Sequence, residues 1–265
     1  MDLKDKVAVV TGAGSGIGRA TAIRLAREGV KVLIADCAED GSMATVSAIN
    51  AAGGEARFVP TDVSSEDDVR RMIEMAESVY GGLDILHNNA GVLGGPRFPD
   101  SPPKYWSRAI DINLRGVLYG IHYGVPALKR RGGGVIVNTT STAGLTPMLL
   151  DPVYAATKAA IVNLTRSLTF LQEEAGVRVN CVCPGPVDTA LERNTSARFD
   201  AQDAENFRQR RAGSGQYLRM EPDEVAKAVL RLIQDDALNG ISCRVVSGAP
   251  WELLPSPLPP KFSGR

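Results

Sequence analysis

The stretch KVAVVTGAGSGIGRATAIRLAREGVKVLIAD, residues 6–36, decides the fold of this chain. It opens with a short run of β-branched and apolar residues (6–11), which is typical of a buried parallel strand. A glycine-rich turn (12–18) follows at once, and a helical pattern (19–28) then ends at Gly29, a suitable C-cap. A second strand pattern (31–35) ends at Asp36. This order predicts a βαβ unit of a doubly wound α/β domain.

The glycine-rich turn has the features of a dinucleotide-binding site. Gly12 permits a tight turn, Gly16 lets the backbone approach a pyrophosphate, and Gly18 allows close packing of the following helix. The N-terminus of that helix offers free N–H groups and a positive dipole end to the phosphates. Together with the strands on either side, the turn predicts that this chain holds the pyrophosphate of a dinucleotide.

Asp36 indicates which dinucleotide binds. It lies about 20 residues beyond the turn, where a carboxylate can accept hydrogen bonds from the adenosine ribose. The same carboxylate would repel a 2′-phosphate, and Cys37 supplies no cation in its place. The sequence therefore favours NAD(H) over NADP(H), while Arg19, which could help to hold a 2′-phosphate, leaves NADP(H) open.

Composition limits the class of protein. A chain of 265 residues with 44% hydrophobic and 23% charged residues is typical of one large globular domain or two small ones. Thirty Lys and Arg balance 30 Asp and Glu, so no field of one sign favours nucleic acid or a membrane surface as partner. No apolar run approaches the ~20 residues of a membrane helix, and the charged start predicts no signal peptide. The four cysteines follow no zinc pattern and indicate thiols in a reducing cytoplasm.

Tyr154 and Lys158 stand four residues apart in a segment with a helical pattern. Side chains at this spacing share one helix face. A free phenol has a pKa near ~10, and a nearby cation can lower it by roughly 1–3 units. The pair can therefore provide a general acid/base near neutral pH. An isolated YxxxK is more often a core tyrosine with a lysine that reaches solvent, so the motif needs support from the rest of the chain.

That support comes from a resemblance to a known family. The spacing TGxxxGxG (Thr11, Gly12, Gly16, Gly18) resembles the glycine motif of the short-chain dehydrogenase/reductase family. NNAG (88–91), the tyrosine–lysine pair and PGPVDT (184–189) resemble later motifs of the family in the same order. The likeness extends over about residues 5–247.

The resemblance implies a fold and its division along the chain. We expect a single Rossmann-type, doubly wound α/β domain at residues 1–250, with a central, mostly parallel seven-stranded sheet between two helical layers. Residues 190–220 would form a substrate lid. Residues 251–265 would form a Pro-rich C-terminal tail that is extended or poorly ordered.

The resemblance also implies a catalytic set of four residues. Tyr154 would exchange the proton, Ser141 would bind the substrate oxygen, and Lys158 would lower the pKa of Tyr154 and hold the nicotinamide ribose. Asn113 would kink its helix, predicted over 105–131, and anchor a water of the proton relay. Substrate contacts are expected from Ser141, Tyr154 and Asp151, which occupies a place that lines the pocket in relatives.

Cofactor contacts follow from the same motifs. Asp62 and Val63 correspond to the adenine contact of the family, and the NNAG segment lies under the adenosine. The PGPVDT segment corresponds to the clamp on the carboxamide and diphosphate. The expected set is Gly12, Ser15, Gly16, Ile17, Gly18, Asp36, Asp62, Val63, Asn89, Ala90, Gly91, Tyr154, Lys158, Pro184, Gly185, Val187 and Thr189. His87 is interpreted as structural, and no metal is expected.

The predicted reaction is NAD-dependent interconversion of a secondary alcohol and a ketone. A 3-oxoacyl-thioester reductase would share the catalytic residues but usually uses NADPH, and a sugar-nucleotide epimerase or dehydratase needs a longer C-terminal region. A non-enzymatic NAD(H) sensor would not need Ser141 and Tyr154. Segments such as DDALNG (235–240) look similar to the branch containing 15-hydroxyprostaglandin dehydrogenase, but its substrate is not carried over. The expected partners are a small alcohol or ketone and further copies of the chain, as a homodimer or homotetramer.

Overall fold

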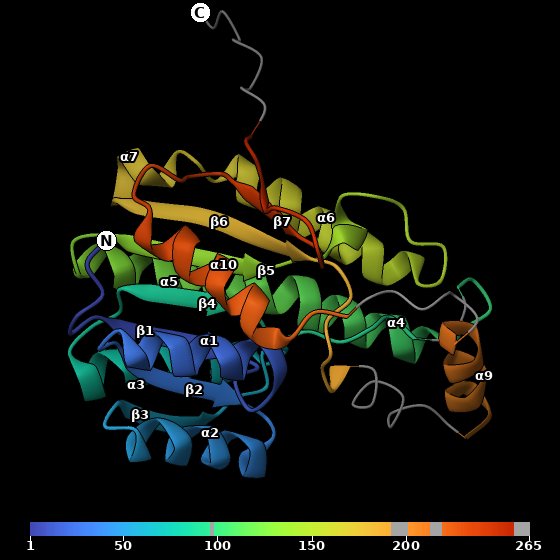
Figure 1. The fold of residues 1–265 in the computed structure, drawn as a ribbon, viewed down its shortest axis with the longest axis horizontal. Coiled ribbons are helices and arrows are strands. Elements are labelled where there is room, and N and C mark those ends of the chain that lie inside the picture. Colours follow the sequence, from blue (N-terminus) through green and yellow to red (C-terminus); the bar gives the residue numbers. More distant parts are fainter. Residues whose placement is uncertain (96–97, 192–200, 213–218, 257–265) are drawn as a thin grey trace, which may run out of the picture.

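The computed structural model describes residues 1–95, 98–191, 201–212 and 219–256. Its centre is an eight-stranded sheet in the order β3-β2-β1-β4-β5-β6-β7-β8 (Figure 1). The first seven strands are parallel, and β8 runs antiparallel to β7. The strands are β1 (Val7–Thr11), β2 (Lys31–Asp36), β3 (Glu55–Pro60), β4 (Ile85–Asn88), β5 (Gly134–Thr139), β6 (Val177–Pro184), β7 (Ser242–Val245) and β8 (Glu252–Leu254).

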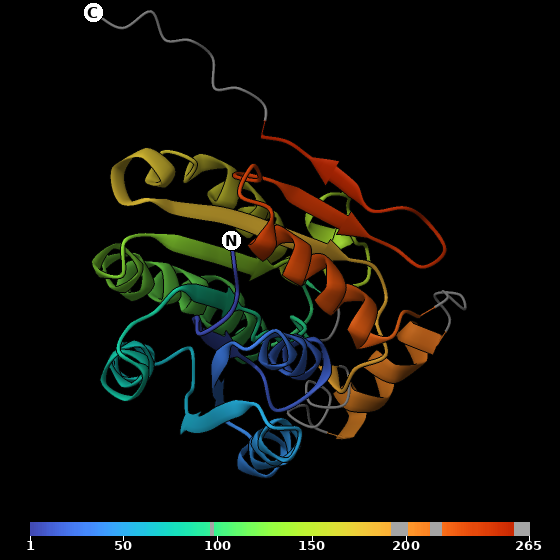
Figure 2. The same ribbon diagram turned by 60° about the vertical axis from the view of Figure 1, so that its left-hand side comes forward.

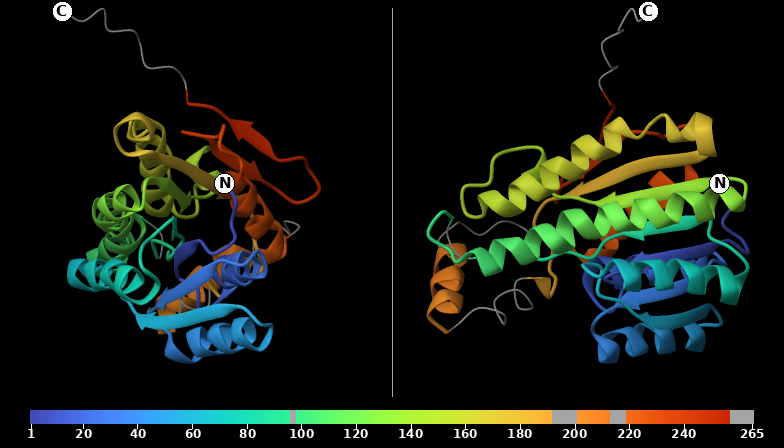
Figure 3. Two further views of the ribbon diagram at one scale, coloured as in Figure 1. Left: turned by 90° about the vertical axis from the view of Figure 1, so that its left-hand side faces the viewer. Right: turned by 180° about the vertical axis from the view of Figure 1, so that it is seen from behind.

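Helices cover both faces of the sheet (Figure 3). One apolar layer joins the sheet to α1 and α10, and the other joins it to α3 and α5. Strand β1 serves both layers because its side chains alternate, with Ala8 and Val10 on one face and Val7 and Val9 on the other. The described helices are α1 (Gly16–Arg27), α2 (Glu39–Ala51), α3 (Glu66–Tyr80), α4 (Pro103–Ile110), α5 (Gly116–Arg130), α6 (Pro152–Ser167), α7 (Leu171–Ala175), α9 (Ala201–Ala212) and α10 (Pro222–Gln234).

The strand order reverses next to β1. From β1 the chain builds outward through β2 and β3, and it then returns to place β4 on the other side of β1. In open α/β sheets, ligands bind at the carboxyl ends of the strands at such a switch point. This confirms the doubly wound fold and locates the candidate site. None of the described helices has the length and apolar composition of a membrane span.

The helix predicted over 105–131 is interrupted. Helix α4 passes into a π-helical turn, η1 (Asp111–Arg115), before α5 begins at Gly116. Asn113 is the middle residue of that turn. Single π-turns inside helices occur frequently at functional sites, so the irregularity draws attention to Asn113.

The sheet has one strand more than the seven expected, and this strand lies within residues 251–265, the predicted tail. Glu252–Leu254 forms β8, which pairs with β7 through the register Cys243↔Leu253 (Figure 2). An edge strand carries unpaired backbone donors and acceptors that a returning segment can satisfy. An ion pair of 2.7 Å between Arg244 and Glu252 adds a side-chain link across this pair. Of the predicted tail and lid, residues 257–265, 192–200 and 213–218 lie outside the described residues.

Candidate active site

The glycine-rich turn lies at the carboxyl end of β1 and starts α1. Gly12 and Gly16 have φ of 65° and 54°, the left-handed region that favours glycine. A Cβ on Gly12 would lie 2.9 Å from the Cα of Ala90, and a Cβ on Gly18 would overlap the carbonyl oxygen of Gly12. Ser15, the N-cap residue, makes no side-chain capping bond to α1. The turn is therefore a close-packed backbone cradle in which the first N–H groups of α1 are available to an anion.

Asp36 and Arg19 hold this cradle from two sides. The Asp36 carboxylate accepts hydrogen bonds from the backbone N–H of Gly14 at 2.8 Å and of Ala38 at 2.9 Å. The Arg19 guanidinium donates to the carbonyl oxygens of Gly14 and Gly41 and to the hydroxyl of Thr45. The one cation that the sequence offered for a 2′-phosphate is thus engaged with the protein itself.

Asp62 is part of a polar cluster that the sequence did not indicate. Its carboxylate accepts hydrogen bonds from the N–H and hydroxyl of Ser64 and from the guanidinium of Arg108 at 2.7 Å. Burial opposes ionisation of Asp62, but the hydrogen bonds from Arg108 and Ser64 outweigh it and hold the pKa of the carboxyl below its ordinary value. The cluster ties the end of β3 to α4.

The NNAG segment fixes the ends of the central strands. The hydroxyl of Thr11 accepts hydrogen bonds from the N–H groups of Asn89 and Ala90, and the Asn89 side chain donates to the carbonyl of Thr11 at 2.9 Å. Asn88 donates to Asn138 at 3.0 Å and so links β4 to β5. These bonds hold the segment beside the glycine turn.

Asn113 is bound to the loop that follows β4. Its side-chain oxygen accepts from the N–H of Val92 at 2.9 Å, and its side-chain nitrogen donates to the carbonyl of Val92 at 2.8 Å. It also donates to the hydroxyl of Thr157 on α6 at 3.2 Å. The π-turn therefore brings one amide side chain into contact with both the loop and the helix that carries Tyr154.

Tyr154 and Lys158 lie together on the buried side of α6. The Lys158 Nζ is 5.6 Å from the centroid of the Tyr154 ring and donates to the carbonyl of Thr139 at 2.9 Å. A Cβ on Gly91 would be 3.4 Å from this Nζ and 3.3 Å from Asn113 Oδ1. Burial lowers the pKa of Lys158 to about 8, so the group is still mostly cationic at pH 7.

Ser141 lies in a short turn that packs on α6. It is the N-cap of the 3-10 turn η2 (Thr142–Gly144), and its hydroxyl accepts from the N–H of Ala143 at 3.1 Å. A Cβ on Gly144 would lie 2.8 Å from the backbone of Lys158. The structure therefore brings the segments that carry Asn113, Ser141, Tyr154 and Lys158 together around α6.

The PGPVDT segment reaches the glycine turn from β6. A Cβ on Gly16 would be 3.1 Å from the methyl carbon of Thr189. Val187 forms a bridge with Met220, and Gly185 donates to the carbonyl of Val245 at 2.8 Å. Thr189 therefore lies beside the glycine turn.

Apolar side chains pack on one side of Tyr154. The Tyr154 ring forms a cluster with Leu93 and Ala143, to which Met148 and Leu191 add partly buried side chains. These residues come from the loops after β4, β5 and β6. The side of the site next to the phenol thus offers hydrocarbon contacts. Among the described residues, no group of three metal-ligating side chains occurs.

Asp151, which was expected to contact the substrate, forms hydrogen bonds within the protein. It is the N-cap of α6 and is only 5% exposed, and its carboxylate accepts from the N–H groups of Tyr154 and Gly94. The sequence held a signal for this capping role, because Asp followed by Pro is a common start of a helix. Nothing in the sequence indicated that Gly94 would be the second hydrogen-bond partner of Asp151.

The surroundings of His87 fit a structural role, and its burial predicts that folding stability depends on pH. Its Nε2 lies 2.9 Å from the hydroxyl of Thr139, and burial lowers the pKa of the imidazole from 6.5 to about 3. Between these values the unfolded chain binds a proton that the folded protein does not. Folding stability therefore declines as the pH falls below 6.5, by about 2 kcal/mol at pH 5.

We expect His87→Leu to remove this decline. Urea unfolding at pH 7 and pH 5 measures it, with His122→Gln as the matched control because that histidine is exposed. An equal loss of stability between the two pH values in wild type and His87→Leu would show that His87 does not cause it.

Comparisons with known proteins agree with this geometry. The family model for short chain dehydrogenases matches residues 6–199. A cyclohexanol dehydrogenase of Acinetobacter sp. (strain SE19) is 38% identical over 235 residues, which are 88% of this chain and 89% of the relative. An uncharacterized oxidoreductase of Thermotoga maritima is 40% identical over 185 residues, 70% of this chain and 73% of the relative.

Solved structures extend the likeness to three dimensions. A short chain dehydrogenase/reductase from Burkholderia phymatum in complex with NAD superposes with a TM-score of 0.79 at 33% identity, covering 88% of this chain and 87% of its own. Levodione reductase superposes with a TM-score of 0.80 at 31% identity, covering 92% and 97%.

Proposed function

The chain belongs to the short-chain dehydrogenase family and is an oxidoreductase with a nicotinamide cofactor, and on this premise we propose that it interconverts a cyclic secondary alcohol and its ketone with NAD(H). The observation that carries the proposal is the pairing of Tyr154 and Lys158 on α6, next to the turn of Ser141 and the amide of Asn113. A protein that only sensed NAD(H) would need neither the hydroxyl of Ser141 nor the phenol of Tyr154, and both are present.

The residues at the strand ends fit a dinucleotide. The glycine turn packs closely against Ala90 and Thr189, because a Cβ on Gly12 or Gly16 would meet them. In the proposal, the N–H groups at the start of α1 hold the pyrophosphate. In the proposal, Asp36 accepts the adenosine ribose hydroxyls. Asp62 and Val63 meet the adenine, and Lys158 holds the nicotinamide ribose. When bound, NAD⁺ supplies the hydride acceptor of the alcohol oxidation.

The protein's own part in the reaction is proton transfer and orientation. Ser141 donates a hydrogen bond to the substrate oxygen and fixes it beside Tyr154. The phenolate of Tyr154 accepts the proton of the alcohol as the carbonyl forms, and in reduction the phenol returns it. The Lys158 ammonium favours the phenolate because it places a positive charge near it. Asn113 anchors the water through which the proton leaves.

The substrate class follows from the apolar cluster at Tyr154. Leu93, Ala143, Met148 and Leu191 offer no charge to a ligand. The carboxylate of Asp151 is already hydrogen-bonded to two backbone amides. A neutral hydrocarbon ring with one hydroxyl or keto group suits such surroundings. The names of two similar proteins, cyclohexanol dehydrogenase and levodione reductase, point in the same direction.

Asp36→Ala tests the choice of NAD over NADP. Removing the carboxylate removes its repulsion of a 2′-phosphate. We expect the ratio of kcat/KM for NAD⁺ over NADP⁺ to fall by about 10–100-fold, equivalent to about 1.4–2.8 kcal/mol. Much of this change should come from weaker use of NAD⁺, because Arg19 is engaged with Gly14 and Gly41 and does not offer a free cation.

Asp36→Asn is the matched control for this measurement. It keeps one acceptor for the N–H of Gly14 but removes the charge, so it separates repulsion from distortion of the turn. Unchanged discrimination in both variants would exclude Asp36 from cofactor selection.

A panel assay with purified protein tests the function as a whole. NADH and NADPH formation are followed with cyclohexanol-type alcohols, terpene alcohols, steroids, hydroxy fatty acids and sugar alcohols. We expect turnover with NAD⁺ and cyclic, uncharged alcohols. Turnover confined to 3-oxoacyl thioesters with NADPH would favour the alternative reductase. Tight NADH binding without turnover on any substrate would favour a non-enzymatic NAD(H) sensor.

The chain is expected to act as a homodimer or homotetramer. This expectation comes from the family resemblance. Light scattering of the purified protein decides the number of copies. The cytoplasm stays the expected location, on the cysteine usage of the sequence alone.

A further inference from the structure

Asp151 connects two parts of the site that are far apart in the sequence. One carboxylate oxygen accepts from the N–H of Tyr154 at 3.0 Å, and the other accepts from the N–H of Gly94 at 2.6 Å. Tyr154 is the third residue of α6, so the first bond is the usual one between an N-cap and its helix. The second bond reaches the loop after β4, 57 residues earlier in the chain.

The loop at residues 91–94 is held at two points. Asn113 binds Val92 through both its N–H and its carbonyl, and Asp151 binds the N–H of Gly94. Between these two anchors, Leu93 belongs to the same apolar cluster as Tyr154. The loop therefore cannot shift without moving the hydrocarbon wall beside the phenol, and Asp151 fixes that wall relative to the backbone of Tyr154.

The contact depends on both residue types. A Cβ on Gly94 would clash with the Oδ1 of Asp151 and lie 3.1 Å from the N of Tyr154, so only glycine permits this approach. A carboxylate offers two acceptor oxygens, one for each N–H. An asparagine would turn an NH₂ group toward one of the two donors, and a buried N–H would lose its partner. The negative charge is also favoured at the N-terminus of α6.

We propose that Asp151 is a positioning residue, which sets the place of Tyr154 relative to the 91–94 loop and does not itself contact the substrate. This inference rests on the proposed function for its effect on turnover. The structural part, the two hydrogen bonds to Gly94 and Tyr154, is independent of which substrate the enzyme uses.

Asp151→Asn tests the proposal with two kinds of measurement. In kinetics we expect kcat to fall by about 10–100-fold, while KM for the alcohol and Kd for NADH change less than about threefold. In hydrogen exchange of the protein without substrate, we expect the amides of Gly94 and Tyr154 to exchange at least about tenfold faster. Exchange in the later turns of α6, which the cap does not touch, should be unchanged.

Control variants make the outcome decisive. Asp67→Asn removes an exposed acid from the first turn of α3 and should leave kinetics and exchange as in wild type. Gly94→Ala disturbs the same contact from the loop side. If Asp151→Asn folds poorly, Gly94→Ala provides the test instead, and we expect the same effects on kcat and amide exchange. If no substrate of the panel is turned over, the exchange data alone decide whether Asp151 holds both amides.

Two results would overturn the proposal. A rise in KM with kcat and amide exchange unchanged would make Asp151 a substrate contact, as the family resemblance implied. Unchanged exchange at Gly94 and Tyr154 in both variants would show that the carboxylate does not hold the loop.

Discussion

Tyr154→Phe is expected to lower kcat for oxidation of a cyclic alcohol by about 10²–10⁴-fold, the range that general acid/base groups contribute. The change removes one oxygen atom and keeps the ring. Because the ring packs with Leu93 and Ala143 and is only 7% exposed, the variant should fold and melt like wild type. The loss would therefore measure the proton transfer and not the packing.

The position of Lys158 explains why the expected fall in kcat is large. Lys158 is 3% exposed and donates a hydrogen bond to the carbonyl of Thr139, so its charge is held close to the ring of Tyr154. A preorganised charge in a dry site acts more strongly than one in water. With phenylalanine, the ammonium remains but no group can take the proton of the alcohol.

Cofactor binding and a second tyrosine serve as controls. NADH fluorescence should report a Kd within about threefold of wild type, because the cradle and Lys158 are untouched. Tyr123→Phe, which loses only an exposed hydrogen bond to Glu66, should keep full activity. Turnover of Tyr154→Phe at the wild-type rate, with intact cofactor binding, would mean that another group is the base.

Features coded by neighbouring residues could be read from the sequence. The turn at Gly12–Gly18 needs backbone freedom at fixed positions, and the structure has positive φ at Gly12 and Gly16. The helix face shared by Tyr154 and Lys158 follows from a spacing of four residues. The family motifs then located the remaining segments, and the structure gathers them at the carboxyl ends of the strands.

Features that depend on distant partners could not be read in this way. Asp151 was recognisable as an acceptor, but only the folded chain brings the N–H of Gly94 to it. The same holds for Arg108, which meets Asp62 across 46 residues. Strand β8 has three residues beside a Pro-rich stretch, too few for a periodic pattern, and it forms because β7 offers an edge.

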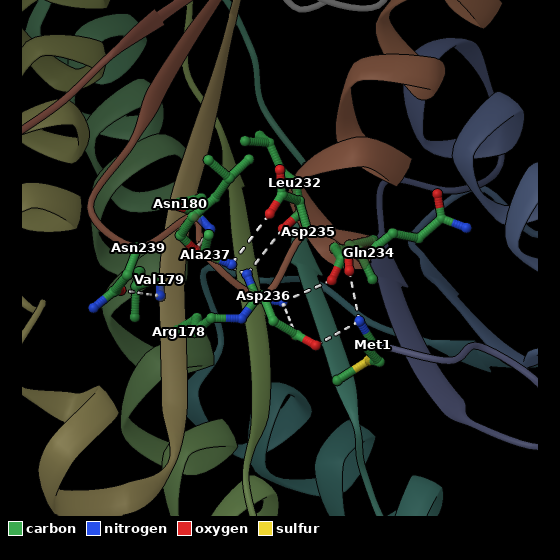
Figure 4. A network of polar contacts seen from close by, with 12 residues as sticks. Met1, Arg178, Val179, Asn180, Leu232, Gln234, Asp235, Asp236, Ala237 and Asn239 are labelled. Atoms are coloured by element: carbon green, nitrogen blue, oxygen red, sulfur yellow. Dashed lines mark hydrogen bonds and ion pairs between the residues drawn. The ribbon is translucent and has the colours of Figure 1, made fainter.

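Arg178→Met is expected to lower the free energy of unfolding by about 3–5 kcal/mol, because several buried carbonyl groups would lose their donor at a cost of about 1–3 kcal/mol each. Figure 4 shows Arg178 at the amino end of β6, directed toward the end of α10. Its guanidinium donates to the carbonyls of Leu232 at 3.1 Å, Ile233 at 2.6 Å and Leu238 at 2.9 Å. Arg178 is 4% exposed, so methionine would leave these acceptors without a donor.

Asp236, the exposed ion-pair partner of Arg178, provides a control variant for this prediction. Asp236 pairs with the guanidinium at 3.2 Å but its side chain is 70% exposed, so Asp236→Asn should cost less than about 1 kcal/mol. For Arg178→Met we expect Tm to drop by roughly 6–20 °C, while kcat of the folded variant stays near wild type because the network lies at the end of β6 away from Tyr154. Equal, small losses in both variants would mean that water replaces the guanidinium at the three carbonyls. A large loss in Arg178→Met alone would identify this arginine as the donor that closes the C-terminus of α10, a stabilising role separate from catalysis.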